Sequence, residues 1–256
     1  MIDLHCHILP GVDDGANSMK DSLEMAKKAV DEGIDTIVAT PHHANRMYEN
    51  PRMHILEKVE ELNHYLGIEG LPLKVLPGQE IRLTGEMMEQ MDLDELLPVN
   101  ESSGYVFVEL PPEQVPTYTK QMLYDLQLAG YKPVIVHPER NKRFLKQPDL
   151  LYHFVNNGAF TQVTAGSVLG KFGKDVQKFS FQMMEASLTH LIASDAHDTK
   201  KRGFFLKDAY EKLRKMYGPN IVYQLMENAQ YVLDGEMVYS DPPERIKSKK
   251  LLGIFG

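Results

Sequence analysis

The sequence predicts an α/β barrel of parallel strands, and two observations indicate this fold class. The chain has 256 residues, a length that is typical of α/β barrels and allows one large core. Short apolar runs alternate along it with amphipathic segments of helical periodicity, which is the pattern of βα units and a parallel sheet. Because seven such apolar runs occur, we expect a single (β/α)7 domain over residues 1–256, one unit short of the commoner eight.

The seven predicted strands are the apolar runs, most of which end beside a polar residue. They cover residues 2–5, 34–40, 73–80, 105–109, 133–137, 159–164 and 190–194. The first helix is predicted to begin at about Ser18 and to end at Gly33, and the second follows Pro51. Later helices are predicted to end at 130 and to cover 149–157, 204–216 and 221–228. Residues from about Tyr231 are expected to form an irregular C-terminal cover that packs on the barrel.

The composition and net charge of the chain argue against some classes of function. The chain is 43% hydrophobic and 25% charged, as in ordinary soluble proteins, and its net charge of −8 argues against nucleic-acid binding. The N-terminus lacks the basic start and apolar run of a signal peptide, and no apolar stretch approaches the ~20 residues that span a bilayer. The single cysteine, Cys6, fits a reducing compartment. We therefore expect a cytoplasmic protein that is not embedded in the membrane.

Residues of the types that bind metal ions follow nearly every predicted strand. The nine candidates are His5, His7, Asp14, His42, Glu80, Glu109, His137, Asp195 and His197. Because the carboxyl ends of parallel barrel strands meet at one mouth, these residues are expected to converge. In His5-Cys6-His7 the side chains alternate, so both imidazoles face one way and Cys6 faces the other. Mixed His and carboxylate ligands suit Zn, Mn or Fe, and nine are about right for three ions that share a bridging carboxylate.

Further candidates lie in the same predicted mouth. Arg140 and Arg202 follow the fifth and seventh strands, and a guanidinium group matches a phosphoryl group with two parallel hydrogen bonds. A surface ion pair is the alternative for either arginine alone, and Arg46 and Arg82 are weaker candidates for the same role. His43 is predicted either to line the pocket or to stabilise a leaving group.

These residues resemble the motifs of the polymerase and histidinol phosphatase (PHP) superfamily. The similar segments are His5-Cys6-His7, Thr40-Pro41-His42, Glu80, His137-Pro138-Glu139-Arg140 and Asp195-Ala196-His197. Within that superfamily, residues 5–15 and 40–43 are most similar to the bacterial protein-tyrosine phosphatases of capsule and exopolysaccharide operons, the CpsB/CapC type. The resemblance extends over essentially the whole chain.

The resemblance implies a distorted (β/α)7 barrel of the PHP type with three divalent metal ions, usually Mn, with Fe, Zn or Mg as substitutes. It implies that the first ion takes His5, His7, Glu80 and Asp195, the second takes Glu80 as a bridge with Glu109 and His137, and the third takes Asp14, His42 and His197. In that family two arginines bind the phosphate, and they match Arg140 and Arg202. The implied substrate is phosphotyrosine in the C-terminal tail of a bacterial tyrosine kinase.

The predicted activity is therefore hydrolysis of phosphotyrosine on protein by a hydroxide that metal ions generate from water. A cysteine-dependent mechanism is excluded, because Val12 and not an arginine stands six positions after Cys6. Three alternatives stay open: a histidinol phosphatase or other small phosphomonoesterase, a polymerase-type exonuclease, and a catalytically silent metal-binding adaptor. The negative net charge disfavours the exonuclease, and the two mouth arginines disfavour the adaptor.

Overall fold

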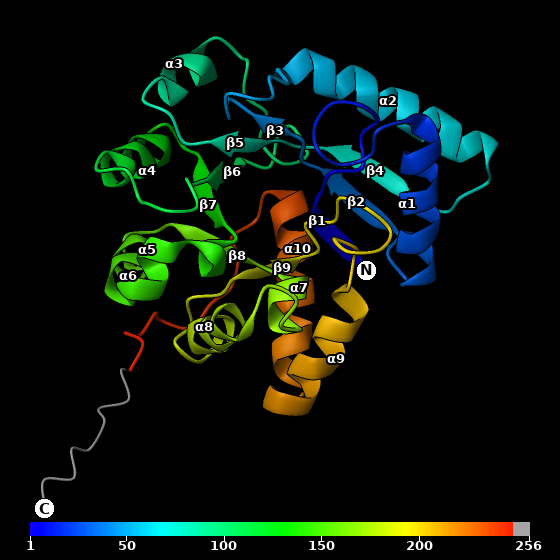
Figure 1. Ribbon diagram of the computed structural model, residues 1–256. Helices are drawn as coiled ribbons and strands as arrows, with labels where there is room; N and C mark the ends of the chain where they lie inside the picture. The colour runs from blue at the N-terminus through cyan, green and yellow to red at the C-terminus, as the bar shows by residue number, and fades with distance from the viewer. Residues whose placement is uncertain (248–256) are drawn as a thin grey trace, which may run out of the picture.

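The computed structural model describes residues 1–247, in which curved parallel strands occupy the centre and helices surround them (Figure 1). The strands are β1 (Ile2–Cys6), β2 (Thr36–Ala39), β3 (His42–His43), β4 (Lys74–Pro77), β5 (Glu80–Arg82), β6 (Tyr105–Glu109), β7 (Lys132–Val136), β8 (Phe160–Thr164) and β9 (Leu191–Ala193). All seven predicted strands are present, and the predicted α/β class with parallel strands is confirmed. The third predicted strand is divided into β4 and β5, and the short strand β3 follows the second predicted strand without having been predicted.

The strands form two parallel sheets and not one continuous ladder within residues 1–247. The orders are β1-β2-β4 and β3-β5-β6-β7-β8-β9. The break after β2 falls at Pro41, which cannot donate to a ladder, and the break after β4 falls at Gly78. A Cβ on Gly78 would lie 2.6 Å from Val38 Cγ1, so a side chain does not fit there. On the other side, the segment after β9 joins β1 through an isolated parallel bridge between Ala196 and Cys6.

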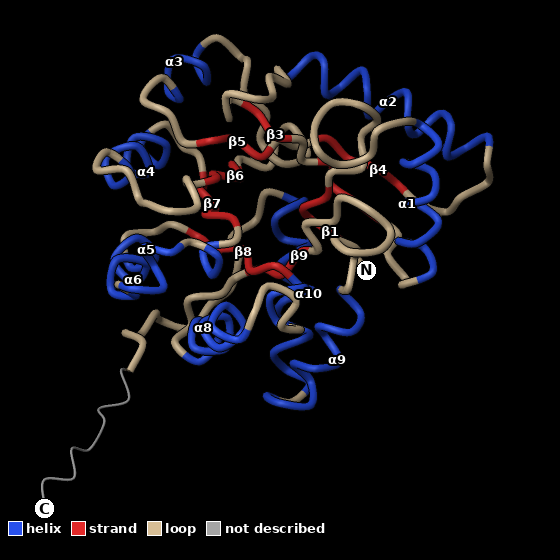
Figure 2. The backbone as a smooth tube through the Cα atoms, in the orientation of Figure 1, coloured by secondary structure: helices blue, strands red, loops and turns tan. Residues whose placement is uncertain are grey.

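Helices cover the outer face of the strands (Figure 2). They are α1 (Met19–Asp31), α2 (Arg52–Ile68), α3 (Met87–Asp92), α4 (Thr119–Leu128), the 3-10 turn η1 (Pro138–Arg140), α5 (Lys142–Lys146), α6 (Pro148–Asn156), α7 (Ala165–Val168), α8 (Lys174–Glu185), α9 (Leu206–Tyr217) and α10 (Pro219–Asp234). Ser18 caps α1 by accepting a hydrogen bond from Asp21 N, and α2 begins directly after Pro51, as predicted. No helix in the described part of the chain is long and apolar enough to cross a membrane.

The helical predictions differ from the structure at α8 and α10, and they lacked the short helices α3, α5 and α7. Helix α8 was not predicted, because it starts after Gly173 without a capping side chain, so the usual start signal is missing. Helix α10 continues to Asp234 and ends at Gly235 in a left-handed conformation, so the predicted irregular cover begins four residues later than Tyr231. This segment contacts the barrel, since Val238 N donates to Tyr105 Oη. Residues 248–256, part of the predicted cover, lie outside the described residues.

An irregularity in β1 positions the first two candidate ligands. The register against β2 shifts between Asp3 and Cys6, as in a β-bulge. Leu4 packs with Phe107 inside the ring of strands, whereas Cys6, two residues later, packs in the outer core between sheet and helices. Regular alternation would put Leu4 and Cys6 on one face, so the shift turns His5 and His7 inward and Cys6 outward.

Candidate metal centre

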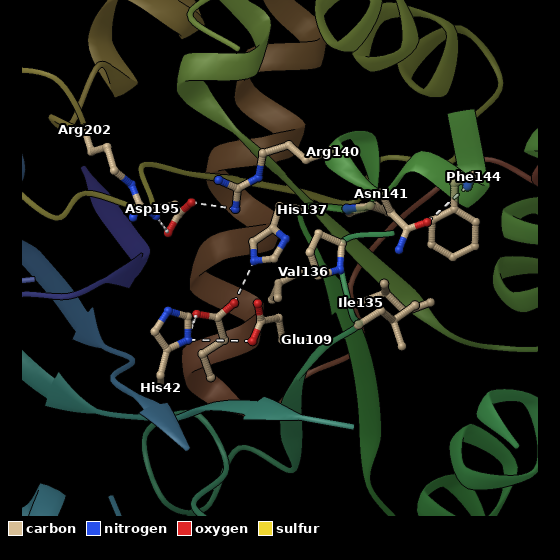
Figure 3. A pocket seen from close by; sticks show the side chains of 14 residues that line it. His42, Glu109, Ile135, Val136, His137, Arg140, Asn141, Phe144, Asp195 and Arg202 are labelled. Carbon is tan, nitrogen blue, oxygen red and sulfur yellow. Dashed lines mark hydrogen bonds and ion pairs between the residues drawn. The ribbon is translucent and has the colours of Figure 1, made fainter. Parts of the chain in front are cut away.

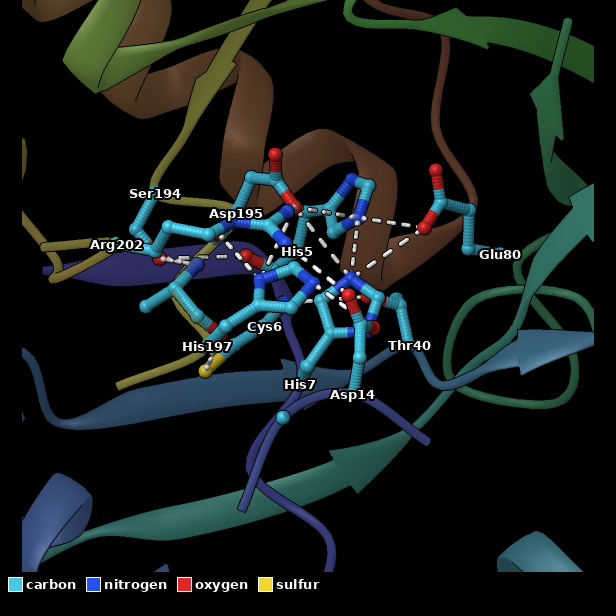
Figure 4. A network of polar contacts seen from close by, with 12 residues as sticks. His5, Cys6, His7, Asp14, Thr40, Glu80, Ser194, Asp195, His197 and Arg202 are labelled. Carbon is cyan, nitrogen blue, oxygen red and sulfur yellow. Dashed lines mark hydrogen bonds and ion pairs between the residues drawn. The ribbon is translucent and has the colours of Figure 1, made fainter. Parts of the chain in front are cut away.

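The nine predicted ligands gather at the carboxyl ends of the strands, around the buried carboxylate of Glu80. Figure 4 shows His5, His7, Asp14, Glu80, Asp195 and His197 together. Strand β1 and the loop after it supply His5, His7 and Asp14, β3 supplies His42, and β5 begins with Glu80 itself. Glu109 ends β6, and the remaining three follow β7 and β9. Every one of the nine lies within 4 Å of another member of the group, so residues separated by up to 192 positions form one polar cluster.

One group is built around the two imidazoles of His5 and His7. Nε2 of His5 and Nε2 of His7 lie 3.2 Å apart, and each lies 3.3–3.4 Å from Glu80 Oε2. Asp195 Oδ1 lies 3.6 Å from the first imidazole and 3.4 Å from the second. A tetrahedral ion with bonds of ~2.0–2.1 Å separates its ligand atoms by about 3.3–3.4 Å. The spacing of the His5, His7 and Glu80 atoms is therefore that of a metal site, and Asp195 Oδ1 lies beside both imidazoles.

Glu80 also connects this group to a second one. Its Oε1 lies 2.6 Å from His137 Nε2, while its Oε2 lies 2.9 Å from His42 Nδ1. Glu109 Oε2 is 3.7 Å from the same His42 nitrogen. The two oxygens of Glu80 thus face different sets of ligands, which is the arrangement that a bridging carboxylate needs.

A third group contains Asp14, and the structure distinguishes it from its neighbour Asp13. Asp14 Oδ1 lies 3.4 Å from His42 Nε2 and 3.3 Å from His197 Nε2. Asp13 lies behind His7 instead, where its Oδ2 is 2.6 Å from Nδ1 of that imidazole and its Oδ1 accepts a hydrogen bond from Gly15 N. Asp14 therefore faces the cluster, and Asp13 orients a member of it.

Two residues that hold the cluster in place were not singled out from the sequence. Besides Asp13, Gln162 on β8 places its Oε1 2.9 Å from Nδ1 of His5. Such outer partners fix the orientation of a ligating imidazole and leave its other nitrogen free. A fully buried glutamine inside an apolar strand was the available signal for Gln162, whereas the signal for Asp13 depends on the path of a loop.

Unsatisfied polar atoms test whether the cluster suits metal ions. Glu80 Oε2, His42 Nδ1 and His197 Nε2 are buried and make no hydrogen bond in residues 1–247. A buried polar atom without a partner costs about 1–3 kcal/mol, and native proteins contain few of them. Here several lone pairs point at common positions, and the ligand types are imidazole and carboxylate. These side chains therefore fit divalent transition-metal ions.

The carboxylates dominate the electrostatics of the cluster. Burial raises the pKa of both Asp195 and Glu80. Arg140 and nearby imidazoles nevertheless hold the pKa of Asp195 well below the usual range, and His42, His5 and His137 do the same for Glu80. Burial lowers the pKa of His42, but Glu80 and Asp14 raise it to about 10. Glu109 differs, since burial and the charge of Glu80 raise its pKa to about 7. Protons and metal ions therefore compete for the same negative site.

Both predicted arginines lie at this mouth and line a pocket of about 250 Å³ with His42, Glu80, Glu109, His137 and Asp195 (Figure 3). Arg140 Nη2 is 2.7 Å from Asp195 Oδ2, and its guanidinium group lies over the Phe172 ring at 5.1 Å. Arg202 Nη1 is 3.2 Å from Asp14 Oδ2. These contacts hold two planar cations at the edge of the pocket, where an anion can bridge them.

His43 is a predicted site residue that reaches neither the pocket nor the cluster of ligands. Because it follows His42 on β3, its side chain points to the opposite side. There it is buried, and its Nδ1 accepts a hydrogen bond from Asn50 N. Its position therefore gives no support to the expected role in lining the pocket or stabilising the leaving group. Arg46 does not line this pocket either, and Arg82 contacts it only through Glu109, at 2.8 Å.

Comparison with known proteins agrees with this geometry. Residues 1–234 match the family described as capsular polysaccharide synthesis, CpsB/CapC. Tyrosine-protein phosphatase YwqE of Bacillus subtilis (strain 168) is 48% identical over 255 residues and 100% of both chains. Tyrosine-protein phosphatase CpsB of Streptococcus agalactiae is 28% identical over 244 residues, which are 93% of this chain and 100% of that protein.

Comparison with solved structures agrees with the comparison of sequences. A crystal structure from a study of YwqE from Bacillus subtilis and CpsB from Streptococcus pneumoniae, described as metal-dependent tyrosine phosphatases, superposes with a TM-score of 0.94. It is 47% identical and covers 97% of this chain and 100% of its own. Organophosphorus hydrolase from Deinococcus radiodurans superposes with a TM-score of 0.54 at 13% identity, covers 91% of each chain and shares the fold alone. The chain therefore belongs to the CpsB/CapC family.

Proposed function

We propose that this chain is a metal-dependent protein-tyrosine phosphatase. The observation that carries the proposal is the pocket in which the cluster of imidazoles and carboxylates meets Arg140 and Arg202. Negative ligands that hold cations, with two guanidinium groups beside them, form a site for a dianionic phosphoryl group. The relatives named tyrosine-protein phosphatases support the same conclusion.

We propose three divalent ions, with Mn as the metal and Fe, Zn or Mg as substitutes. The first would be held by His5, His7, Glu80 and Asp195, the second by Glu80, Glu109 and His137, and the third by Asp14, His42 and His197. When bound, such ions neutralise phosphoryl oxygens and lower the pKa of a water molecule to near 7. The outer partners Asp13 and Gln162 would keep two of the imidazoles in the required orientation.

The two arginines would orient the phosphate and stabilise charge on its equatorial oxygens. Arg140 is largely buried beside Asp195, so its guanidinium group is fixed before substrate binds. Arg202 reaches the same pocket from the loop after β9. Fixed donors lower the barrier because they need no rearrangement as charge develops. The phenolate leaving group has a pKa of ~10 and needs little protonation, so the site does not require a strong general acid.

We further propose that the protein substrate is the C-terminal tail of a bacterial tyrosine kinase of capsule or exopolysaccharide synthesis, and that the enzyme is cytoplasmic. The family description supports the connection with capsule synthesis. The described helices are too short or too polar to span a membrane, which agrees with a substrate segment reached from solution.

The first experiment compares a phosphotyrosine peptide, a phosphoserine peptide and histidinol phosphate, after chelation and then with Mn²⁺ restored. We expect Mn²⁺-dependent phosphate release from the phosphotyrosine peptide and little from the other two. Preference for histidinol phosphate would retain the metal site but overturn the substrate. No turnover of any substrate by metal-loaded protein would favour a silent binding protein.

A further inference from the structure

A second and larger hollow lies beside the pocket, at the same end of the strands. It has a volume of about 780 Å³ and is bounded by the loops that follow β3, β5 and β6. Residues that line it are Ala44, Asn45, Arg46, Arg82, Leu83, Thr84, Gly85, Glu86, Pro111, Gln114, Pro116 and Tyr118. We call it the loop hollow. None of the nine predicted ligands lines it, so metal binding does not account for this hollow.

The loop hollow and the metal pocket are separated by the thickness of one side chain. Arg82 lines the hollow, and its Nη2 lies 2.8 Å from Oε2 of Glu109, which lines the pocket. The segment after β6 borders both, since Pro111 faces the hollow while Leu110 and Pro112 face the pocket. A molecule bound in the pocket can therefore continue into the hollow over on the order of three residues of extended peptide.

The size of the pocket requires such an extension for a protein substrate. Its volume of about 250 Å³ is below the ~300–1,000 Å³ of pockets that enclose a whole drug-sized ligand. It can take the phosphoryl group and part of the ring of a phosphotyrosine, whereas the neighbouring residues of a peptide must lie outside it. The loop hollow is the adjoining space that can receive them.

The charge of the hollow indicates which residues it would receive. Arg46 is exposed and makes no ion pair in residues 1–247, and Arg82 has a buried Nε without a hydrogen bond. Glu86 is the one carboxylate among the residues that line the hollow. Because Glu109 pairs with Arg82 at 2.8 Å, Arg46 is the positive charge of the hollow that stays unpaired in residues 1–247. Arginine pairs with carboxylates through parallel hydrogen bonds, so an acidic side chain is the complementary ligand.

Arg46 is presented by a loop with a defined shape. Its backbone is left-handed, with φ 72°, and the side chain of the preceding Asn45 accepts hydrogen bonds from Met47 N and Tyr48 N. These two bonds close the turn around Arg46 before any ligand arrives. The same loop follows His42 and His43 directly, so it connects the hollow to the metal cluster through the backbone.

We propose that the loop hollow binds an acidic side chain of the substrate within about three residues of the phosphotyrosine, with Arg46 as its principal partner. This inference rests on the proposed phosphotyrosine phosphatase function. The inference adds that the enzyme prefers certain residues next to the phosphotyrosine of its substrate. It assigns this preference to residues outside the metal cluster.

The test uses phosphotyrosine peptides in which a single Glu is placed at each of the three positions before and after the phosphotyrosine, with Gln at that position in the matched peptide. The metal-loaded enzyme is expected to show about three- to tenfold higher kcat/KM for the Glu peptide at one or more positions. Arg46→Gln is expected to remove this preference and Arg46→Lys to keep part of it. Free phosphotyrosine, which does not reach the hollow, is expected to be hydrolysed at the wild-type rate by Arg46→Gln.

Arg214→Gln on α9 is the matched control, because it removes one exposed positive charge on a different part of the molecule. The inference is overturned if wild-type enzyme shows no Glu preference, if the preference survives Arg46→Gln, or if Arg214→Gln removes it equally. Fluorescence anisotropy of a labelled unphosphorylated Glu peptide separates this outcome from failure of the proposed function. Binding that depends on Arg46 without turnover of any phosphotyrosine peptide would keep the hollow and reject the phosphatase.

Discussion

The two ends of the strand bundle both bury histidines, but they use them differently. At the opposite end from the metal cluster, His190 is 4% exposed, and its Nδ1 accepts a hydrogen bond from Thr161 N. Its backbone oxygen accepts another from Asn228 Nδ2. At the mouth, His42 Nδ1 and His197 Nε2 are buried without hydrogen bonds and face carboxylates. His190 thus has neutral hydrogen-bond partners, whereas the mouth histidines converge on carboxylates.

The burial and the pKa of a histidine do not by themselves show whether it is structural or belongs to the metal cluster. Burial lowers the pKa of both His190 and His137 to about 4. What separates them is the neighbourhood, because His137 also has Arg140 and Glu80 beside it, whereas burial is the cause for His190. A pair of substitutions at the two ends should therefore give opposite patterns of metal content and stability.

The largest expected effect comes from Glu80→Gln. Glu80 contacts His5, His7, His42 and His137 through its two oxygens, so a neutral amide weakens the two ion positions that it shares and removes a partner of His42 at the third. We expect kcat/KM for a phosphotyrosine peptide to fall more than about 100-fold, beyond the loss caused by removing an outer partner of a ligand. Metal content measured by elemental analysis should fall with it. Wild-type metal content in this variant would contradict the central position of Glu80.

A smaller effect is expected from Asp13→Asn. The carboxylate 2.6 Å from His7 Nδ1 fixes that imidazole, and the amide keeps the shape while removing the charge. Outer-partner changes of this kind weaken metal affinity about 10–100-fold. Competition with a chelator measures the affinity, and excess Mn²⁺ should restore most of the activity. If excess metal restores nothing, Asp13 acts on the reaction by a route other than orienting His7.

The fold and most of the site could be predicted from the sequence because they depend on local pattern. Strand-end residues such as Glu109 and Asp195 are brought to one mouth by parallel topology alone, whatever the detailed path of the loops. Which of Asp13 and Asp14 faces the cluster depends on that path, and the structure decides it. The two breaks at Pro41 and Gly78 depend on neighbouring strands, which a pattern along one chain does not contain.

His43 and Gln162 illustrate a second limit. His43 has the residue type of a catalytic group and the right neighbour, but alternation along β3 turns it away from the pocket. Gln162 lies in a run that reads as an apolar strand, and its role follows from the His5 ring on a different strand. Contacts between elements that are distant in sequence therefore decide which polar residues serve the site.

A still smaller effect, on stability and not on chemistry, is expected from His190→Asn. Asn can accept the hydrogen bond from Thr161 N but does not titrate. In the folded protein the pKa of His190 is lowered to about 4 from 6.5, so the unfolded chain binds the proton first as pH falls. His190 thus costs the wild type about 2 kcal/mol of unfolding free energy between pH 7.5 and pH 5.

Denaturant unfolding at the two pH values measures this difference. The loss of stability on acidification should be smaller in His190→Asn than in wild type by about that amount. Metal content and kcat/KM at pH 7.5 should stay within about twofold of wild type, in contrast to Glu80→Gln. Equal acid sensitivity of the two proteins would show that His190 is not kept neutral by burial.

The smallest effect is expected from Cys6→Ser, which tests the two faces of one strand. Cys6 stands between His5 and His7, but its side chain is fully buried in the outer core, with Sγ 3.6 Å from Ala196 O. Burial, together with nearby Asp3, Asp195 and Asp13, raises the pKa of its thiol well above the usual value, so the thiolate nucleophile is not formed at neutral pH. Activity and metal content should match wild type, with a stability loss of about 1 kcal/mol for the buried hydroxyl. Loss of turnover with metal retained would place a cysteine in the reaction, against the geometry of β1. Retained turnover would show that the inward face of β1, which carries the imidazoles of His5 and His7, serves the chemistry.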